Sequence, residues 1–482
     1  MPIAYATVAI RIIWIRFDRW RERGLLFALA ALVLAGIAVA GEGVAAWLRW
    51  PGIVLVIAAT VLGAPIYVAL GGAALVLFWA DGTPIASVAA ETVRQVASPT
   101  MPTIPLFTFA GYLLAESQTS TRLVRVMRAL VGWLPGGAAI ITAAVCAFFT
   151  TFTGASGVTI LALGGLLLPI LLKGRYPEGF SIGLLTASGS IGLLFPPSLP
   201  VIFYGVIAGV PVDQLYVAGL LPGLVLVAAV AAFGARVGVK HGAERVPFAL
   251  REAGAALWEA KWELMLPLIV VSSIAFGWTT LVEAAALTAA YALFIEVVIY
   301  KDLGIRADLP RVARECSVLI GGVLIILGVA MGFTSYLVDA EIPARGLELV
   351  RGEISSRWVF LAVLNLFLLL VGCLMDIYSA VVVVVPLILP IAAHFGVHPI
   401  HLGIIFLANL ELGFLTPPVG MNLFLSAYRF DKPVMEVARR ALPFLLVLIL
   451  AVLLITYLPS LTLAPVEWLF GPGALAPQEI DL

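Results

Sequence analysis

The chain has 482 residues, of which 62% are hydrophobic and only 12% are charged, and its formal net charge is zero. A soluble domain carries about a quarter charged residues, so this composition excludes an ordinary soluble protein. Zero net charge gives no general attraction to nucleic acid, and no nucleic-acid partner is expected. Several apolar runs match the roughly 20 residues that a helix needs to cross a bilayer. The sequence therefore predicts an all-α polytopic membrane protein.

The stretch 1–50 is predicted to form an N-terminal membrane anchor. Residues 1–23 are rich in arginine and interleaved with aromatic residues, a pattern typical of an amphipathic segment bound to membrane lipid. The apolar run at 25–47 is predicted to be a retained transmembrane helix. Because arginines precede it, the N-terminus is expected in the cytoplasm.

The rest of the chain divides by hydropathy into two apolar regions separated by a more polar one. Residues 236–315 contain two basic stretches on either side of two predicted helices, so both stretches are expected on the cytoplasmic side. The predicted organisation is a first transport repeat at 51–235, amphipathic arm segments and scaffold helices at 236–315, a second transport repeat at 316–463 and a tail at 464–482.

Two proline pairs interrupt otherwise apolar segments, at Pro196-Pro197 and Pro417-Pro418. Adjacent prolines remove backbone donors and clash with the preceding helical turn, so each predicted helix must stop and restart there. Within a membrane, such a break is tolerated only where protein, water or a bound ion satisfies the freed backbone groups.

The two proline pairs belong to an internal repeat, whose offset is the sequence separation of Pro196 and Pro417. The same offset places Pro169 on Pro390, Gly192 on Gly413 and Phe203 on Phe424. A repeat with broken helices in corresponding positions indicates the binding site of a secondary transporter.

A second interruption precedes each proline pair, at residues 151–157 and at residues 371–379. Each half thus has two breaks, which we expect to meet near the membrane midplane. Hydroxyls and unwound carbonyls at such breaks suit Na⁺, and free helix N-termini suit an anionic substrate. Hydropathy leaves open whether the two repeats are inverted.

These motifs, taken in order, resemble the large membrane subunit of the tripartite ATP-independent periplasmic (TRAP) transporters. The resemblance runs from about residue 51 to 459. Its markers are residues 104–111, 130–137, 196–200, 282–286, 372–376 and 415–420.

The resemblance implies an elevator-type transporter with two inverted repeats and re-entrant hairpins in a bacterial inner membrane. Such subunits use the Na⁺ gradient to import organic acids delivered by a periplasmic binding protein. They pair with a small four-helix membrane subunit, which is expected here to be a separate chain, although the helix at 25–47 resembles the linker of fused subunits.

The resemblance also implies two Na⁺ sites. The positions that match the first are Thr153, Ser156, Gly192, Phe195 and Pro196. The positions that match the second are Gly372, Gly413, Thr416 and Val419. This chain departs from the family in having threonine at 153 where serine is more usual, and the sequence Thr-Gly-Ala-Ser-Gly at the first break.

Four further polar residues lie near the breaks. Ser188 and Ser190 are candidate substrate contacts, Asp376 is either a cation ligand or a helix N-cap, and Glu411 either lines the substrate path or makes a packing contact. An ionisable residue in an apolar segment is costly and indicates a functional role by default.

Other polar groups are predicted to be structural. His394, His398 and His401 are interpreted as a solvated loop rather than a metal site, and Glu283 as a helix N-terminal carboxylate. Arg122, Arg125 and Arg128 recur at helical spacing and predict a solvated or headgroup face, with docking of a partner as the alternative. No stretch of the sequence resembles an enzyme site, so the chain is not expected to be an enzyme. No phosphate-binding Gly-x-x-x-x-Gly-Lys motif occurs, so ATP hydrolysis by this chain is not expected.

Two alternatives stay open. One is a stand-alone elevator-type symporter of Na⁺ and divalent anions, which needs no binding protein. The other is a membrane scaffold that transports nothing.

Overall fold

A computed structural model describes residues 42–61, 66–98, 100–275 and 277–475. The predicted amphipathic segment at 1–23 and most of the predicted helix at 25–47 lie outside these ranges. The described residues form two compact units, divided between Ala90 and Glu91. In the first, α3 (Glu42–Val61) packs on α4 (Ile66–Ala80), and α5 (Ala86–Val96) spans the boundary between the units.

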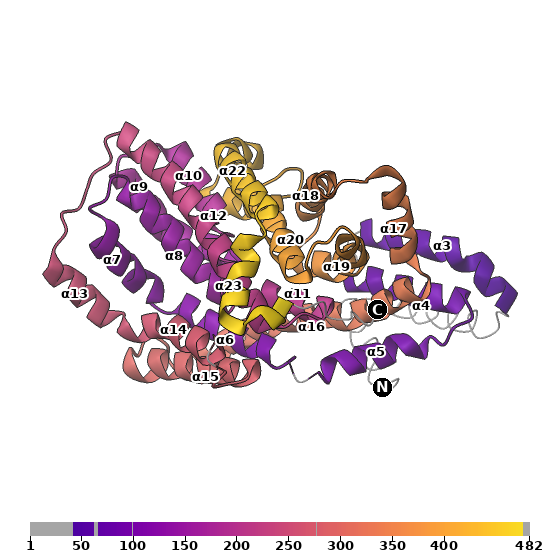
Figure 1. Ribbon diagram of the computed structural model, residues 1–482. Coiled ribbons are helices and arrows are strands. Elements are labelled where there is room, and N and C mark those ends of the chain that lie inside the picture. Colours follow the sequence, from indigo (N-terminus) through magenta and orange to yellow (C-terminus); the bar gives the residue numbers. More distant parts are fainter. Residues whose placement is uncertain (1–41, 62–65, 99, 276, 476–482) are drawn as a thin grey trace, which may run out of the picture. The chain divides into compact units, whose positions relative to one another are not determined.

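The second unit contains two series of helices in matching order (Figure 1). The first series is α6 (Thr103–Glu116), α7 (Thr119–Val131), α8 (Gly137–Thr153), α9 (Ser156–Lys173), α10 (Glu178–Ser188), α11 (Leu199–Ala208) and α12 (Val212–Lys240). The second is α16 (Asp308–Asp339), α17 (Ile342–Glu353), α18 (Arg357–Leu374), α19 (Ile377–His394), α20 (Pro399–Gly413), α21 (Met421–Phe430) and α22 (Val434–Tyr457).

The remaining helices of this unit connect or follow the two series. They are α13 (Leu250–Glu259), α14 (Lys261–Ala275), α15 (Leu281–Phe294), the π-helix η1 (Ile295–Ile299), α23 (Ser460–Phe470) and the short 3-10 helix η2 (Pro472–Leu475).

Helix positions in the two series follow the sequence offset that relates Pro196 to Pro417. Moving α9 by this offset places it on the bounds of α19, and moving α10 by the same amount places its first residue on the first residue of α20. Both proline pairs lie between matching helices, and both contain a cis peptide bond. The predicted boundaries at 235/236, 315/316 and 463/464 fall inside α12, α16 and α23, and the division into domains stays a prediction.

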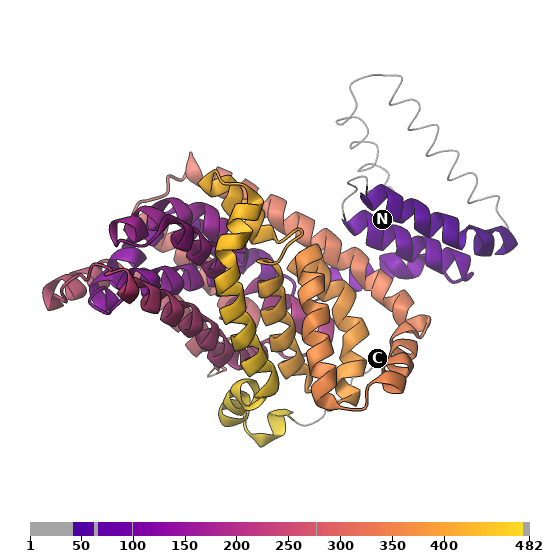
Figure 2. The ribbon, with the colours of Figure 1, turned by 90° about the horizontal axis from the view of Figure 1, so that it is seen from above.

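The two series exchange contacts reciprocally. Helix α11 of the first packs on α19 of the second, and α21 of the second packs on α9 of the first. In the same way, α12 packs on α20 and α22 packs on α10. Figure 2 shows the long gold α22 between the purple helices of the first series and the orange helices of the second. Each series therefore packs on the other through helices at matching positions.

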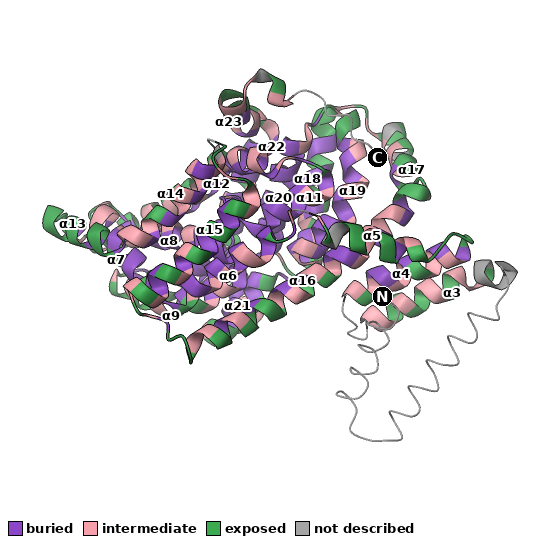
Figure 3. Ribbon diagram, turned by 90° about the horizontal axis from the view of Figure 1, so that it is seen from below, coloured by how far each residue is buried: buried purple, intermediate pink, exposed green. Residues whose placement is uncertain are grey.

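Seven helices among the described residues are long and apolar enough to cross a membrane. Helices α10, α11, α20 and α21 are shorter, with 11, 10, 15 and 10 residues. At about 1.5 Å per residue, none of these four spans a hydrocarbon core of about 30 Å. Of these, α20 is central, since every one of its residues after Pro399 is buried (Figure 3).

Candidate transport site at the helix breaks

The first break separates α8 from α9 at Gly154, which has a left-handed backbone (φ +61°) that glycine adopts without strain. An added Cβ there would also meet Leu199, the first residue of α11, at 2.8 Å. The break is therefore packed directly against the turn that follows the first proline pair.

Threonine hydroxyls connect α8 to the turn between α10 and α11. Thr150 Oγ1 donates to the Gly189 carbonyl at 2.8 Å, and Thr151 Oγ1 donates to the Gly192 carbonyl at 3.1 Å. Gly192 has no room for a side chain, because an added Cβ would overlap the Ala147 carbonyl. The sequence does not single out the hydroxyls of Thr150 and Thr151, although Thr151 lies within the predicted break at 151–157.

Several buried hydroxyls in this region lack a hydrogen-bond partner among the described residues. They belong to Ser156, Ser188, Ser190 and Ser198. The Ser156 carbonyl lies beside Gly189, 3.5 Å from where a Cβ would be, so Ser156 is next to the backbone between Ser188 and Ser190. A buried hydroxyl without a partner costs about 1–3 kcal/mol, which a ligand or water offsets.

The other residues predicted for the first Na⁺ site also lie in this region. Thr153 Oγ1 lies 3.4 Å from the Ala155 carbonyl. Phe195 and Pro196 lie in the turn, where the Phe195 carbonyl accepts from Ser198 N–H at 2.9 Å. Burial of Thr153 and Pro196 keeps bulk water away from this turn.

The second break, like the first, contacts the turn with the proline pair of its own series. Glycines make this contact in place of threonine hydroxyls. Gly372 near the end of α18 and Gly413 at the end of α20 touch, and an added Cβ on Gly413 would overlap the Gly372 backbone. Gly420 N–H reaches the Cys373 carbonyl at 3.4 Å. The structure thus brings together two residues predicted for the second Na⁺ site.

Thr416 and Val419 lie in the turn after α20. Thr416 Oγ1 donates to the Leu412 carbonyl at 2.9 Å, which leaves its oxygen lone pairs open. Val419 is 46% exposed, and its side chain has no oxygen atom. Only its backbone carbonyl can therefore bind an ion.

Asp376 is an N-cap. Its Oδ1 accepts from the backbone N–H groups of Tyr378 at 3.0 Å and Ser379 at 3.1 Å, and its Oδ2 accepts from the Ser379 hydroxyl. These bonds satisfy the free donors at the start of α19.

Substitution of Asp376 separates capping from cation binding. Asp376→Asn keeps an acceptor oxygen and is expected to leave the Na⁺ dependence of uptake unchanged, whereas Asp376→Ala is expected to cost about 1 kcal/mol of stability. The apparent melting temperature and Na⁺-dependent uptake of both variants measure this. A loss of Na⁺ dependence in Asp376→Asn with normal stability would instead assign the carboxylate to the ion.

The two breaks contact each other. Tyr378 Oη at the start of α19 donates to the Gly154 carbonyl at 3.0 Å, and its ring packs edge-on against Phe203 of α11 at 5.0 Å between centroids. At the matching place in the other series, Gly157 at the start of α9 meets Leu425 of α21. The four interruptions therefore form one connected region of the second unit.

Glu411 is buried in α20, and neither of its carboxyl oxygens has a hydrogen-bond partner among the described residues. Glu411 and Ser190 occupy equivalent positions in the two repeats. The Ser190 hydroxyl is likewise buried without a partner in the described part of the chain. Glu411 lies within a helix rather than a loop, and its role in the substrate path stays a prediction.

The structure corrects two predictions about other polar groups. Arg122 is buried at 8% exposure rather than solvated, while Arg125 lies on an exposed face and pairs with Glu252 and Glu259. His401 is buried too, with Nδ1 2.8 Å from Thr462 Oγ1, so the prediction of a solvated loop is wrong for this histidine, whereas His394 is exposed.

One other prediction is confirmed. Glu283 closes a capping box with Thr280. Among the described residues no group of three His, Cys, Asp or Glu side chains is placed to hold a metal ion.

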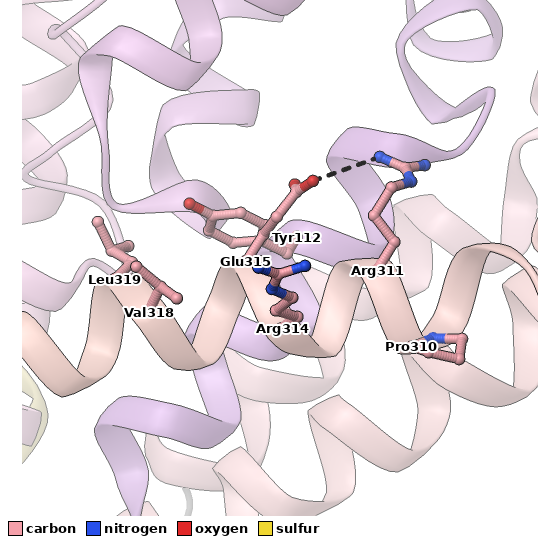
Figure 4. A pocket seen from close by; sticks show the side chains of 7 residues that line it. All are labelled: Tyr112, Pro310, Arg311, Arg314, Glu315, Val318 and Leu319. Carbon is pink, nitrogen blue, oxygen red and sulfur yellow. Dashed lines mark ion pairs between the residues drawn. The ribbon is translucent and has the colours of Figure 1, made fainter. Parts of the chain in front are cut away.

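A surface cavity of about 780 Å³ lies apart from these residues, where α6 meets the start of α16 (Figure 4). Tyr112, Arg311, Arg314, Glu315 and Val318 line it, and Arg311 pairs with Glu116 at 2.7 Å. It contains none of the predicted site residues, so the breaks stay the candidate transport site.

Comparison with known proteins decides the family. A family model described as "Tripartite ATP-independent periplasmic transporter, DctM component" matches residues 53–461. The chain belongs to this family. It is a large TRAP permease subunit, a multi-pass protein of the cytoplasmic membrane and not an enzyme.

Relatives of this TRAP permease match it over most of its length. It is 33% identical to the C4-dicarboxylate TRAP transporter large permease protein DctM of Rhodobacter capsulatus, over 85% of this chain and 97% of the relative. It is 32% identical to the isethionate TRAP transporter permease protein DctMQ of Oleidesulfovibrio alaskensis, over 96% of this chain and 73% of the relative. The ectoine TRAP transporter large permease protein TeaC of Halomonas elongata is 31% identical, over 75% and 84%.

Among solved structures, the YdaH transporter of Alcanivorax borkumensis has a similar fold. Its TM-score is 0.57 with 14% sequence identity, covering 80% of this chain and 89% of that one. At this identity the likeness concerns the fold alone, which is that of an all-helical, multi-span membrane protein.

Proposed function

We propose that this TRAP permease imports an organic acid by Na⁺ symport, together with a small four-helix membrane subunit and a periplasmic substrate-binding protein. The relatives are named for a C4-dicarboxylate, isethionate and ectoine, which are all small charged solutes. The observation that carries the proposal is the set of buried hydroxyls beside the first break that lack a partner among the described residues.

Two Na⁺ ions bind at the paired breaks. The first ion is bound by hydroxyl and carbonyl oxygens of Thr153, Ser156, Gly192, Phe195 and Pro196. The second uses carbonyls of Gly372, Gly413 and Val419 with the Thr416 hydroxyl. Oxygen ligands from unwound backbone are what Na⁺ sites of secondary transporters use. The ions complete an anion site to which Ser188, Ser190 and Glu411 contribute.

The transport movement follows from the reciprocal packing. Helices α10 and α11, and likewise α20 and α21, form re-entrant hairpins, because none is long enough to cross the membrane alone. The two repeats are inverted, and the hairpins with the broken helices α8–α9 and α18–α19 move across the membrane as one body. Small-residue contacts such as Gly372–Gly413 support rigid movement, since they lock the break to its hairpin.

Reconstitution tests the tripartite function against the two alternatives. Proteoliposomes with this chain and its small membrane subunit receive a radiolabelled organic acid, with or without its periplasmic binding protein. Uptake is expected only when the loaded binding protein and the small subunit are both present. Uptake by this chain alone would favour the stand-alone symporter, and no uptake in any combination would favour the scaffold.

A further inference from the structure

A buried ionic cluster lies away from the helix breaks, where α7 meets α14 and the π-helix η1. We call it the Arg122 cluster, and it consists of Thr119, Arg122, Glu263, Glu296 and Asp302. Arg122 is 8% exposed, and both glutamates are fully buried. Three carboxylates therefore face one guanidinium.

The guanidinium forms short ion pairs with two of the three carboxylates. Glu263 Oε1 lies 2.6 Å from both Arg122 Nε and Nη2, and Asp302 Oδ2 lies 2.7 Å from Nη2. Glu296 Oε2 is farther away, at 3.4 Å. Glu296 is thus the carboxylate that Arg122 compensates least.

A hydrogen count shows a deficit at Thr119. Its Oγ1 lies 2.9 Å from Glu263 Oε1, 3.1 Å from Glu296 Oε1 and 2.7 Å from Ser117 Oγ, and Ser117 Oγ lies 3.0 Å from the Leu114 carbonyl. These four contacts each need a hydrogen, but the two hydroxyls supply two. Ionised carboxylates only accept hydrogen bonds. A hydrogen on Glu296 Oε1 raises the supply to three: Thr119 then accepts from Glu296 while it donates to Glu263, and the Ser117 hydrogen goes to one of its two neighbours.

The charge count agrees with the hydrogen count. Three ionised carboxylates beside one guanidinium would leave two uncompensated buried charges, which is costly. The other titratable groups facing the cluster bring no positive charge: Tyr300 stacks on Arg122 at 3.8 Å, and Tyr291 donates to the Trp262 carbonyl. The nearby Lys261 ammonium lies over the Trp258 ring instead.

Two independent features indicate that something binds here. Glu263 is fully buried, yet its Oε2 has no hydrogen-bond partner among the described residues. Glu296 lies in η1, a single π-helical turn of five residues. Such turns in α-helices occur frequently at functional sites.

We propose that Glu296 holds a proton at neutral pH, and that the Arg122 cluster is a proton-binding site that joins α7 to α14 and α15. Loss of the proton adds a second uncompensated charge and removes the bond to Thr119. The stabilisation by the protonated form is therefore present at low pH and is lost as pH rises through the ionisation of Glu296. The site acts on the helices outside the breaks, so it does not depend on the proposed Na⁺ coupling.

Paired isosteric variants of the purified full-length chain test this assignment. Glu296→Gln imitates the protonated acid and is expected to keep the wild-type apparent melting temperature at pH 6 and to lose less of it than wild type at alkaline pH. Glu263→Gln removes the charge that pairs with Arg122 and is expected to lower the melting temperature by several degrees at every pH. Infrared spectroscopy is expected to show a protonated-carboxyl stretch in wild type that Glu296→Gln lacks.

The opposite results overturn the proposal. A tolerated Glu263→Gln with a destabilised or unfolded Glu296→Gln would place the proton elsewhere, because glutamine matches the size and the donor of a protonated glutamate. Equal effects of both substitutions, or an infrared band that Glu296→Gln leaves unchanged, would contradict a proton on Glu296.

Discussion

Replacing Gly413 with alanine is expected to impair transport severely. The added Cβ would overlap the backbone of Gly372, which cannot rotate away as a side chain would. Overpacking a core costs about 1–3 kcal/mol even where side chains adapt, so about 3 kcal/mol or more is expected here. Separation of α18 from α20 would also misplace the carbonyls of the second break. Uptake by proteoliposomes is expected to fall at least about tenfold.

Gly254→Ala is the matched control for this substitution. Gly254 lies in α13 and has no atom within 4 Å of its added Cβ among the described residues. Alanine there is expected to stabilise the helix by up to about 1 kcal/mol and to leave uptake unchanged. Normal uptake by Gly413→Ala would show that the contact between the break and the hairpin is not needed for transport.

Removing hydroxyls from the two breaks is expected to weaken Na⁺ dependence. Ser156→Ala and Thr416→Ala each delete one oxygen proposed to bind an ion. At about 1.5–3 kcal/mol for a bond to a charge, each is expected to raise the Na⁺ concentration for half-maximal uptake by roughly ten- to a hundredfold. Measuring uptake against Na⁺ concentration for each variant tests this.

Ser317→Ala is the control for these hydroxyl deletions. Ser317 lies on an exposed face of α16, where its hydroxyl donates to the Ala313 carbonyl within the same helix. Its Na⁺ dependence is expected to equal that of wild type. Ser156→Ala and Thr416→Ala curves that superimpose on the Ser317→Ala curve would exclude both hydroxyls as ligands.

The repeat and its breaks could be predicted because proline and glycine act locally. A proline pair stops a helix wherever it occurs, so the offset between Pro196 and Pro417 placed α19 and the start of α20 correctly. Gly192 and Gly413 could be predicted for the same reason. The contact of Gly372 with Gly413 then followed from the repeated pairing of breaks.

Contacts between polar residues that lie far apart in the sequence could not be predicted. Arginines at helical spacing have the pattern of a solvated face, but the carboxylates that bury Arg122 lie 141 and 174 residues away along the chain. The bonds of the Thr150 and Thr151 hydroxyls to the Gly189 and Gly192 carbonyls could not be predicted either, because those carbonyls lie 39 and 41 residues further along the chain. For Asp376, both interpretations fitted the sequence, and only its bonds to Tyr378 and Ser379 identified the N-cap.

Measurement of uptake under an imposed inward Na⁺ gradient tests the central claim most directly. Proteoliposomes containing this permease with its small subunit and loaded binding protein are assayed with Na⁺ outside only, with equal Na⁺ on both sides, and with Na⁺ replaced by K⁺. Concentrative uptake is expected under the inward Na⁺ gradient alone, with only equilibration at equal Na⁺. Concentrative uptake that is the same under all three conditions would contradict Na⁺ coupling at the paired breaks.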